Sequence, residues 1–339
     1  MNDVLTRRFL LARHPVGPTA PEDFRLEAHD LGTRPSDRVR VRSLLWGVDP
    51  GLRSRMTGAA SYTAGLQVGG PISGFTVGEV VASDLPAFPS GAVVLGSWGW
   101  TEFADVDPAA LEQAPDRGDL PLESLLGVLG IPGITAFLGV RQIGRVSPGD
   151  RVLVSSAAGG VGSLAAQIAA IEGATVTGLA GGTAKCTWLR DELGLAGTID
   201  HTAEPDLTAA FGQAFPDGID VVFDNVGNRV IDAALPHMRD HGRIVVCGQV
   251  QDMDLPPAER APLRNTRTLV TRRLRIEGFV ALDHRADFDE ARARLREWAA
   301  AGRLQGTTTV EVGFERLPAA FTSLFSGGNR RGRTVVAAG

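Results

Sequence analysis

An apolar strand followed by a glycine-rich turn and an apolar helix most constrains the fold of this 339-residue chain. Residues 151–156 have the pattern of a buried strand, and residues 161–172 that of a helix rich in Ala, Leu and Ile. Between them lies Ala157-Ala-Gly-Gly-Val-Gly162, which matches G-x-G-x-x-G with alanine in the first glycine position. Such a turn lets the backbone approach a phosphate group at the positive end of a helix. The sequence therefore predicts a dinucleotide-binding unit.

Strand-like and helix-like segments alternate after this turn. Further strands are expected at 174–179, 197–200, 219–224, 242–247 and 275–280, and helices at 183–193 and 287–302. Continuous apolar strands alternating with helices imply a parallel sheet that is covered on both faces. The pattern predicts an α/β fold with a doubly wound sheet.

The first 120 residues or so have a different sequence pattern. Short β-like runs at 39–46, 75–82 and 92–96 are separated by Gly, Pro and Asp, as in a loop-rich β domain. A length of 339 residues at roughly 150 residues per domain allows about two domains.

Composition excludes several classes of protein. The net charge is −5, from 34 basic and 39 acidic residues, so we expect no nucleic-acid partner. Two cysteines cannot form a disulfide framework. The first residues lack the apolar core of a signal peptide, and the longest uncharged stretch, 125–140, is too short to cross a bilayer. We therefore expect a cytoplasmic protein without a membrane partner.

The type of dinucleotide follows from the second expected strand. An NAD-selective site usually has Asp or Glu there, about 20 residues after the glycine turn, to bind the ribose 2′-hydroxyl. This chain instead has Leu179-Ala-Gly-Gly-Thr-Ala-Lys185, and Lys185 is its only lysine. An ammonium group would neutralise a 2′-phosphate, so the sequence favours NADPH.

Candidate metal ligands and nucleophiles do not form a known motif. Cys186 and Cys247 are far apart and fit no zinc spacing. His237 and His241 stand four apart on an expected helix, but the Glu of a zincin is missing between them. No Gly-x-Ser-x-Gly segment supports a serine nucleophile. We expect no metal and no covalent catalysis.

Taken together and in order, the motifs resemble those of zinc-independent medium-chain dehydrogenases/reductases. More narrowly, they are similar to the branch of prostaglandin, alkenal and curcumin reductases. The matching segments are Val48–Met56, Gly74–Val81, Gly99–Phe103, Gly127–Phe137, Ala157–Ser163, Ala180–Cys186, Phe223–Gly227, Val246–Val250, Arg273–Val280 and Gly328–Val336. Where zinc-containing relatives carry a thiolate and Gly-His-Glu, this chain has Gly47-Val-Asp49 and Gly74-Phe-Thr76.

The resemblance implies a specific architecture. A Rossmann NADPH-binding domain at 124–303 would be inserted into a GroES-like β-barrel catalytic domain at 1–123, completed by 304–339. The active-site cleft would lie at the domain junction, and the family is usually dimeric, which implies a homodimer.

The resemblance also implies which residues bind the cofactor. The expected set, which begins in the glycine turn and ends in the tail, is Ala158, Gly159, Gly160, Val161, Gly162, Gly181, Lys185, His201, Asn225, Cys247, Gly248, Phe279, Val280 and Asn329. His201 stands where the family has a tyrosine near the adenosine phosphate, and a histidine can also donate to a phosphate.

The implied reaction is hydride transfer from NADPH to the β-carbon of an α,β-unsaturated ketone or aldehyde, followed by protonation of the enolate. Many relatives place a tyrosine near the enolate oxygen in a Gln-Tyr-Asn segment, and here Met253 occupies its position. The donor is therefore either Tyr62, the only tyrosine, or the ribose hydroxyl of the cofactor. Met56, Tyr62 and Met253 are the expected substrate-pocket residues, and methionine favours an apolar, adaptable pocket. A zinc-free quinone or carbonyl reductase, and an NADPH-binding protein with little catalysis, remain as alternatives.

Overall fold

The computed structural model describes residues 4–58, 64–253, 255 and 257–339. The chain divides into two compact units, each built from separate stretches of sequence. The β unit contains residues 1–126, 308–328 and 334–339, and the Rossmann unit contains residues 127–307 and 329–333. Tail residues 329–333 thus group with the Rossmann unit, although the family resemblance implies that they belong to the catalytic domain.

The Rossmann unit is built on a six-stranded parallel sheet. Its strands are β8 (Arg151–Val154), β9 (Thr175–Ala180), β10 (Gly197–Asp200), β11 (Ile219–Asp224), β12 (Met238–Val246) and β13 (Arg275–Gly278). They lie in the order β10-β9-β8-β11-β12-β13, which is the 3-2-1-4-5-6 order of dinucleotide-binding folds. The order reverses between β8 and β11, and in such sheets ligands bind outside the carboxyl ends of the strands at this point.

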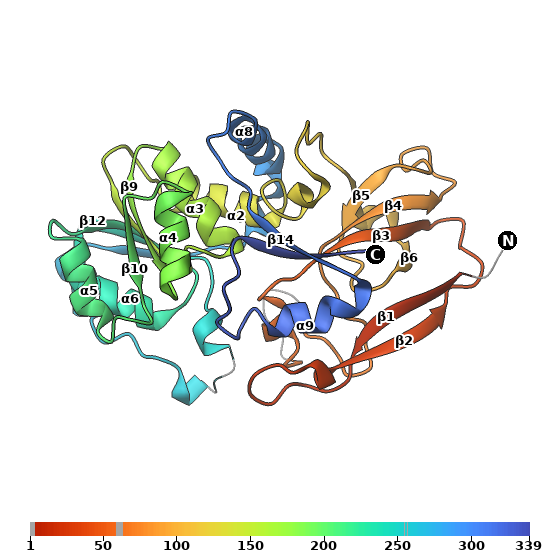
Figure 1. Cartoon of the computed structure of the whole chain (residues 1–339), viewed down its shortest axis with the longest axis horizontal. Helices are drawn as coiled ribbons and strands as arrows, with labels where there is room; N and C mark the ends of the chain where they lie inside the picture. Colours follow the sequence, from red (N-terminus) through yellow and green to blue (C-terminus); the bar gives the residue numbers. More distant parts are fainter. Residues whose placement is uncertain (1–3, 59–63, 254, 256) are drawn as a thin grey trace. The chain divides into compact units, whose positions relative to one another are not determined.

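Four helices pack against strands of this sheet (Figure 1): α3 (Gly160–Ile171), α4 (Thr183–Asp191), α5 (Leu207–Ala214) and α6 (Asn228–Ala234). Helix α2 (Ile131–Leu138) packs on α3, and α8 (Phe288–Ala300) packs on α2. The short helix α7 (Arg267–Thr271) lies beside the residues that follow α6. A buried cluster that includes Phe211 from α5, Ile231 from α6 and Val222 from β11 fills the space between helices and sheet. In α8, the apolar stripe is buried as its spacing predicts, and Arg292 is buried with it because its Nε donates to the Leu129 carbonyl at 3.2 Å.

One local prediction is wrong. The segment between His237 and His241 was expected to be helical, but residues 238–246 form strand β12. His241 has a φ of 62°, a left-handed conformation that no α-helix contains, and its N–H donates to the Arg272 carbonyl at 2.7 Å. The two histidines therefore do not share a helix face.

The β unit contains two sheets. Strands β1 (Leu5–Leu11) and β2 (Phe24–Asp30) pair with each other in antiparallel register. The second sheet has the order β14-β15-β3-β4-β5-β7, with β6 also paired to β3. Its strands are β3 (Val39–Gly47), β4 (Thr76–Ala82), β5 (Val93–Gly96), β6 (Phe103–Val106), β7 (Leu111–Gln113), β14 (Thr308–Val312) and β15 (Arg333–Ala337). Two short helices, α1 (Leu52–Arg55) and α9 (Leu317–Thr322), complete the unit.

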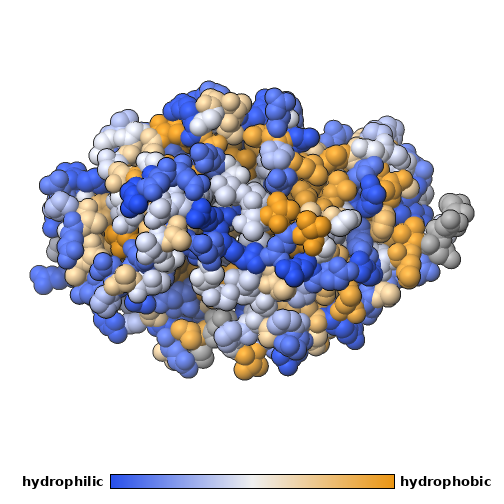
Figure 2. Space-filling model, in the orientation of Figure 1, coloured by the Kyte–Doolittle hydropathy of each residue, from blue (hydrophilic) through white to orange (hydrophobic). Residues whose placement is uncertain are grey.

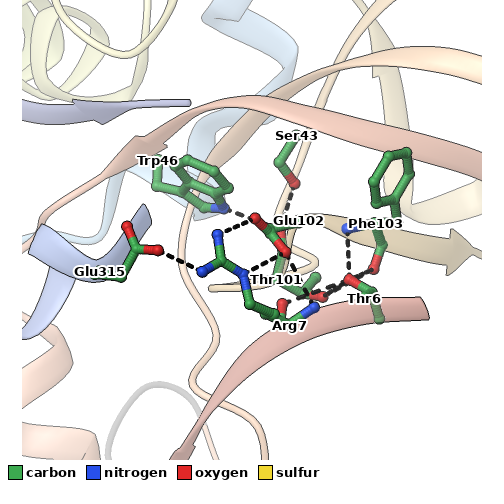
Figure 3. Close-up of polar contacts among 8 residues, drawn as sticks. All are labelled: Thr6, Arg7, Ser43, Trp46, Thr101, Glu102, Phe103 and Glu315. Atoms are coloured by element: carbon green, nitrogen blue, oxygen red, sulfur yellow. Dashed lines mark hydrogen bonds and ion pairs between the residues drawn. The ribbon is translucent and has the colours of Figure 1, made fainter. Parts of the chain in front are cut away.

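An aromatic core and a polar network hold the β unit together. Trp46, Trp100 and Phe321 are buried in one cluster. Arg7 on β1 forms a bidentate pair with Glu102, with Nη2 2.6 Å from Oε1, and also pairs with Glu315 (Figure 3). These contacts connect strand β1, the segment before β6 and the segment before α9, so distant parts of the sequence are held in one unit.

On the face that Figure 2 shows, hydrophilic residues cover much of the surface, and hydrophobic residues gather in the upper right part of the view. Among the helices of the described residues, none has the length and apolar character needed to span a membrane.

Candidate functional site

The glycine-rich turn joins β8 to α3 at the carboxyl edge of the sheet. Gly159 caps the helix with extended backbone angles, and α3 begins at Gly160. A Cβ atom added to Gly162 would lie 2.2 Å from the Ser156 carbonyl oxygen, so a side chain there would collide with the backbone. The turn is therefore tight, and the first amide groups of a twelve-residue helix are left without partners in the helix. This arrangement fits a bound pyrophosphate.

The tail of the chain lies against this turn. The Gly332 N–H donates to the Ala158 carbonyl at 2.8 Å, and Gly332 forms a parallel bridge with Gly159. Gly332 has a φ of 69°, and a Cβ atom on it would lie 2.0 Å from the Thr307 carbonyl oxygen. This close approach requires glycine. It brings the segment that carries Asn329, an exposed residue, into the same unit as the glycine turn.

Lys185 lies in the first turn of α4, directly after the glycine pair that follows β9. Its side chain is half-buried and makes no hydrogen bond or ion pair with any residue that the structure describes. Burial lowers the pKa of this amine below its usual range. Asp200, at the end of β10, holds the turn by accepting the Gly182 N–H at 2.8 Å. A half-buried cation that has no counterion in the described part of the chain fits a bound 2′-phosphate.

His201 belongs to the same turn. Its N–H donates to the Ala180 carbonyl at 3.0 Å, which fixes it beside the end of β9. A Cβ atom added to Gly181 would lie 2.8 Å from His201 Nε2, so the imidazole occupies space that only glycine leaves open. His201 is exposed. The structure therefore brings His201, which follows β10, beside Gly181 at the end of β9, four residues before Lys185.

A buried carboxyl group connects the ends of β8 and β11. Asp224 is fully buried and accepts the Ser155 hydroxyl at 2.6 Å and the Gly227 N–H at 2.7 Å. Burial raises the pKa of Asp224 to about 6, although these hydrogen bonds act in the opposite direction. Ser155 in turn accepts the Asn225 N–H at 2.8 Å, and the Asn225 side chain donates to the Ser155 carbonyl at 2.7 Å. Asn225 is thereby held at the strand ends.

The backbone carbonyl of Asp224 also holds the residues that follow β12. The N–H groups of Cys247 and Gly248 donate to the Asp224 carbonyl at 2.8 and 3.2 Å. A Cβ atom on Gly248 would lie 3.0 Å from the Asn225 carbonyl oxygen. Burial, with a smaller contribution from the Asp224 charge, raises the pKa of the Cys247 thiol to about 12. Cys247 is therefore a neutral packing group near pH 7.

The segment after β12 carries Asp252 and Met253. The Gln251 N–H donates to the Val226 carbonyl at 3.0 Å, so this segment lies against the turn that follows β11. Asp252 is 8% exposed, and its Oδ1 has no hydrogen-bond partner among the described residues. Met253 is half-buried. Sequence reasoning singled out Met253 and missed Asp252, because burial of a carboxylate in an irregular segment leaves no periodic signal.

The remaining expected residues occupy varied positions. Phe279 and Val280 follow β13 and are half-buried, and Phe279 Cζ would lie 2.9 Å from a Cβ atom on Gly139. Met56 has no exposed surface and packs in the aromatic core of the β unit. Tyr62 lies outside the described residues.

Comparisons with known proteins agree with this architecture. One family model, described as the N-terminal domain of oxidoreductase, matches residues 7–114. A second, described as zinc-binding dehydrogenase, matches residues 160–297. The NADPH-dependent curcumin reductase of Escherichia coli is 36% identical, over 97% of this chain and 96% of its own. The chain belongs to the zinc-independent medium-chain dehydrogenases/reductases.

Two more members of this family illustrate the extent of the match. The NADP(+)-dependent 2-alkenal reductase of Nicotiana tabacum is 37% identical, over 89% of this chain and 87% of its own. The structure of CurA in complex with NADPH from Vibrio vulnificus superposes with a TM-score of 0.92 at 32% identity, covering 98% of this chain and 99% of that chain. The expected family and its α/β fold class are confirmed, and the protein is an oxidoreductase. Within the described part of the chain, no three or more His, Cys, Asp or Glu residues group as a metal site.

Proposed function

We propose that this protein uses NADPH to reduce the C=C bond of α,β-unsaturated ketones and aldehydes. The observation that carries the choice of coenzyme is Lys185, a half-buried ammonium without a counterion among the described residues, beside the glycine pair after β9. The choice of reaction rests on family membership, because its relatives include curcumin and alkenal reductases.

In this proposal, each group of expected residues in the Rossmann unit contacts a different part of NADPH. The glycine turn before α3 would hold the pyrophosphate, and Lys185 with His201 would hold the 2′-phosphate. Asn225, Cys247 and Gly248, which are fixed together through Asp224, would lie along the nicotinamide ribose. Phe279 and Val280 would contact the carboxamide region, and Asn329 would donate to the coenzyme from the tail.

The chemistry divides between the coenzyme and the protein. NADPH supplies the hydride when it is bound. The protein orients the substrate, excludes water and provides a donor for the carbonyl oxygen, where negative charge develops. Tyr62 is our candidate for that donor, with the coenzyme's ribose hydroxyl as the alternative. Met56 and Met253 would make the pocket apolar, although the burial of Met56 in the core favours an indirect contribution through packing.

An acceptor panel tests this function. NADPH oxidation would be followed with an enone, with its saturated ketone and with a quinone, and the products would be identified by mass spectrometry. We expect the enone to be converted to the saturated ketone and the saturated ketone to be left unchanged. Reduction of the quinone or of the C=O bond alone would indicate the alternative reductase, and tight NADPH binding without turnover would indicate a binding protein.

We also infer that the protein acts in the cytoplasm as a homodimer, as the family resemblance implies. Light scattering coupled to size exclusion would give twice the chain mass if this assembly is correct, and the mass of one chain if it is not.

A further inference from the structure

Lys185 is a half-buried amine rather than a fully solvated surface cation. It is half-buried at the start of α4 and has no carboxylate partner among the described residues. Without a counterion, desolvation favours the neutral amine, and the positive end of a nine-residue helix acts in the same direction. The neutral amine, which carries a free electron pair, is the form that attacks carbon electrophiles.

The two cysteine thiols are poorly suited to compete with this amine. Cys186 is buried, and burial raises the pKa of its thiol, with a smaller effect from Asp200. The pKa of Cys247 is about 12. Both groups therefore keep their protons at neutral pH, whereas the thiolate is the reactive form. Among 34 basic residues no second lysine exists to compete with Lys185.

We propose that Lys185 is a modification site for α,β-unsaturated aldehydes, and that a bound 2′-phosphate shields it. The inference rests on the proposed function, since it takes the expected substrate class as the reagent and the expected coenzyme as the shield. It adds a chemical vulnerability: the enzyme reacts with its own substrates when its coenzyme site is empty.

The chemical step is a conjugate addition. The Nζ electron pair forms a bond to the β-carbon of the enal, and the π electrons of the C=C bond move through the carbonyl to give an enolate. The α-carbon then takes up a proton while the nitrogen loses one to solvent. No oxidant or reductant is needed, and the product retains the full mass of the enal, unlike an imine, which loses water.

A bound 2′-phosphate would block this step in two ways. Its negative charge stabilises the ammonium form and so removes the free electron pair. Its oxygens would also cover the nitrogen through hydrogen bonds. Ligands with the 2′-phosphate should therefore protect Lys185, and ligands without it should not.

The test is covalent labelling with trans-2-hexenal, followed by peptide mapping. We expect an adduct of full hexenal mass on the peptide that contains Lys185, and none from hexanal, which lacks the electrophilic β-carbon. Labelling should increase with pH, with a midpoint below that of Nα-acetyl-lysine. At ten times its dissociation constant, 2′,5′-ADP should slow labelling about tenfold, because about one site in eleven stays free. The same concentration of 5′-AMP should not.

Two variants provide matched controls. Lys185→Arg keeps the positive charge but removes the reactive amine, so this peptide should carry no adduct. Arg190→Lys adds a second lysine at the other end of α4, where Arg190 is exposed and pairs with Asp191 at 2.7 Å. That exposed, paired lysine should label more slowly than Lys185, and 2′,5′-ADP should leave its rate unchanged.

Three outcomes would overturn the proposal: no adduct at Lys185, equal labelling of the lysine introduced at position 190, or labelling that 2′,5′-ADP does not slow. Labelling requires no turnover, so a failure here is distinguishable from a failure to reduce enones in the acceptor panel.

Discussion

The Ser155 hydroxyl donates to Asp224 Oδ1 at 2.6 Å and ties the end of β8 to the end of β11. These two strands flank the point where the strand order of the sheet reverses. Asp224 also holds the N–H groups of Gly227, Cys247 and Gly248 through its carboxylate and carbonyl oxygens. One buried residue thus fixes the turns after two neighbouring strands, on which Asn225 and Cys247 lie.

Replacing Ser155 with alanine should loosen these turns. The hydroxyl donates to Asp224 and accepts from the Asn225 N–H, so its loss removes the shortest hydrogen bond of the buried carboxylate and the acceptor of the Asn225 N–H. We expect about 1–3 kcal/mol lower free energy of unfolding and weaker NADPH binding. Urea denaturation and NADPH fluorescence titration would measure the two effects. If the variant is destabilised but its coenzyme affinity is unchanged, the hydrogen bonds of Ser155 stabilise the fold without affecting coenzyme binding.

The buried Asp224 should make stability depend on pH. Its pKa rises from an ordinary value of 3.8 in the unfolded chain to about 6 in the folded protein. The folded protein therefore holds the proton of Asp224 more tightly than the unfolded chain does. The resulting contribution to the free energy of unfolding is complete below pH 3.8 and is lost as the pH rises through 6. The two-unit difference corresponds to at most about 3 kcal/mol.

Asp224→Asn removes this titration and serves as the reference. The free energy of unfolding of the parent relative to Asp224→Asn should decrease between about pH 4 and pH 6.5 and stay level above that range. Denaturation curves at several pH values would measure the difference. A parent protein that gains stability over the same interval, relative to the variant, would show that the folded-state pKa of Asp224 is not raised.

Two glycines of the turn before α3 should respond differently to alanine. In Gly162→Ala the new Cβ would lie 2.2 Å from a backbone oxygen, and the helix start would have to move. We expect a loss of about 3 kcal/mol or more. In Gly160→Ala the nearest atom is 3.4 Å away, on Arg333, and alanine favours the helix, so stability should be kept. Thermal unfolding of both variants would measure the two changes in stability. Equal losses in the two variants would contradict the described geometry of the turn.

Tyr62→Phe tests the candidate donor. If the phenol hydrogen-bonds the developing enolate, its removal should lower kcat at least about tenfold with little change in NADPH affinity. Steady-state kinetics on an enone would measure this. An unchanged kcat would remove Tyr62 from the mechanism and favour the ribose hydroxyl.

Local patterns predicted much of the fold, including the glycine turn between β8 and α3 and the position of Lys185 after β9. The glycine turn, Lys185 and the strands around them are contiguous in sequence, so residue order alone was enough to place them. The Ser155–Asp224 bond joins residues 69 positions apart and depends on which strands are neighbours, which spacing does not reveal. The helix expected at His237 and His241 was wrong because residues 238–246 form strand β12, in which His241, rather than the glycine that follows it, takes the left-handed conformation.

The most direct test of this account is coenzyme discrimination in Lys185→Met, which removes the ammonium but keeps an unbranched apolar stem of similar length. We predict that the dissociation constant for NADPH increases by about 10–100-fold, the equivalent of one charged hydrogen bond, while that for NADH stays the same. An unchanged ratio of the two constants would contradict the claim that Lys185 recognises the 2′-phosphate.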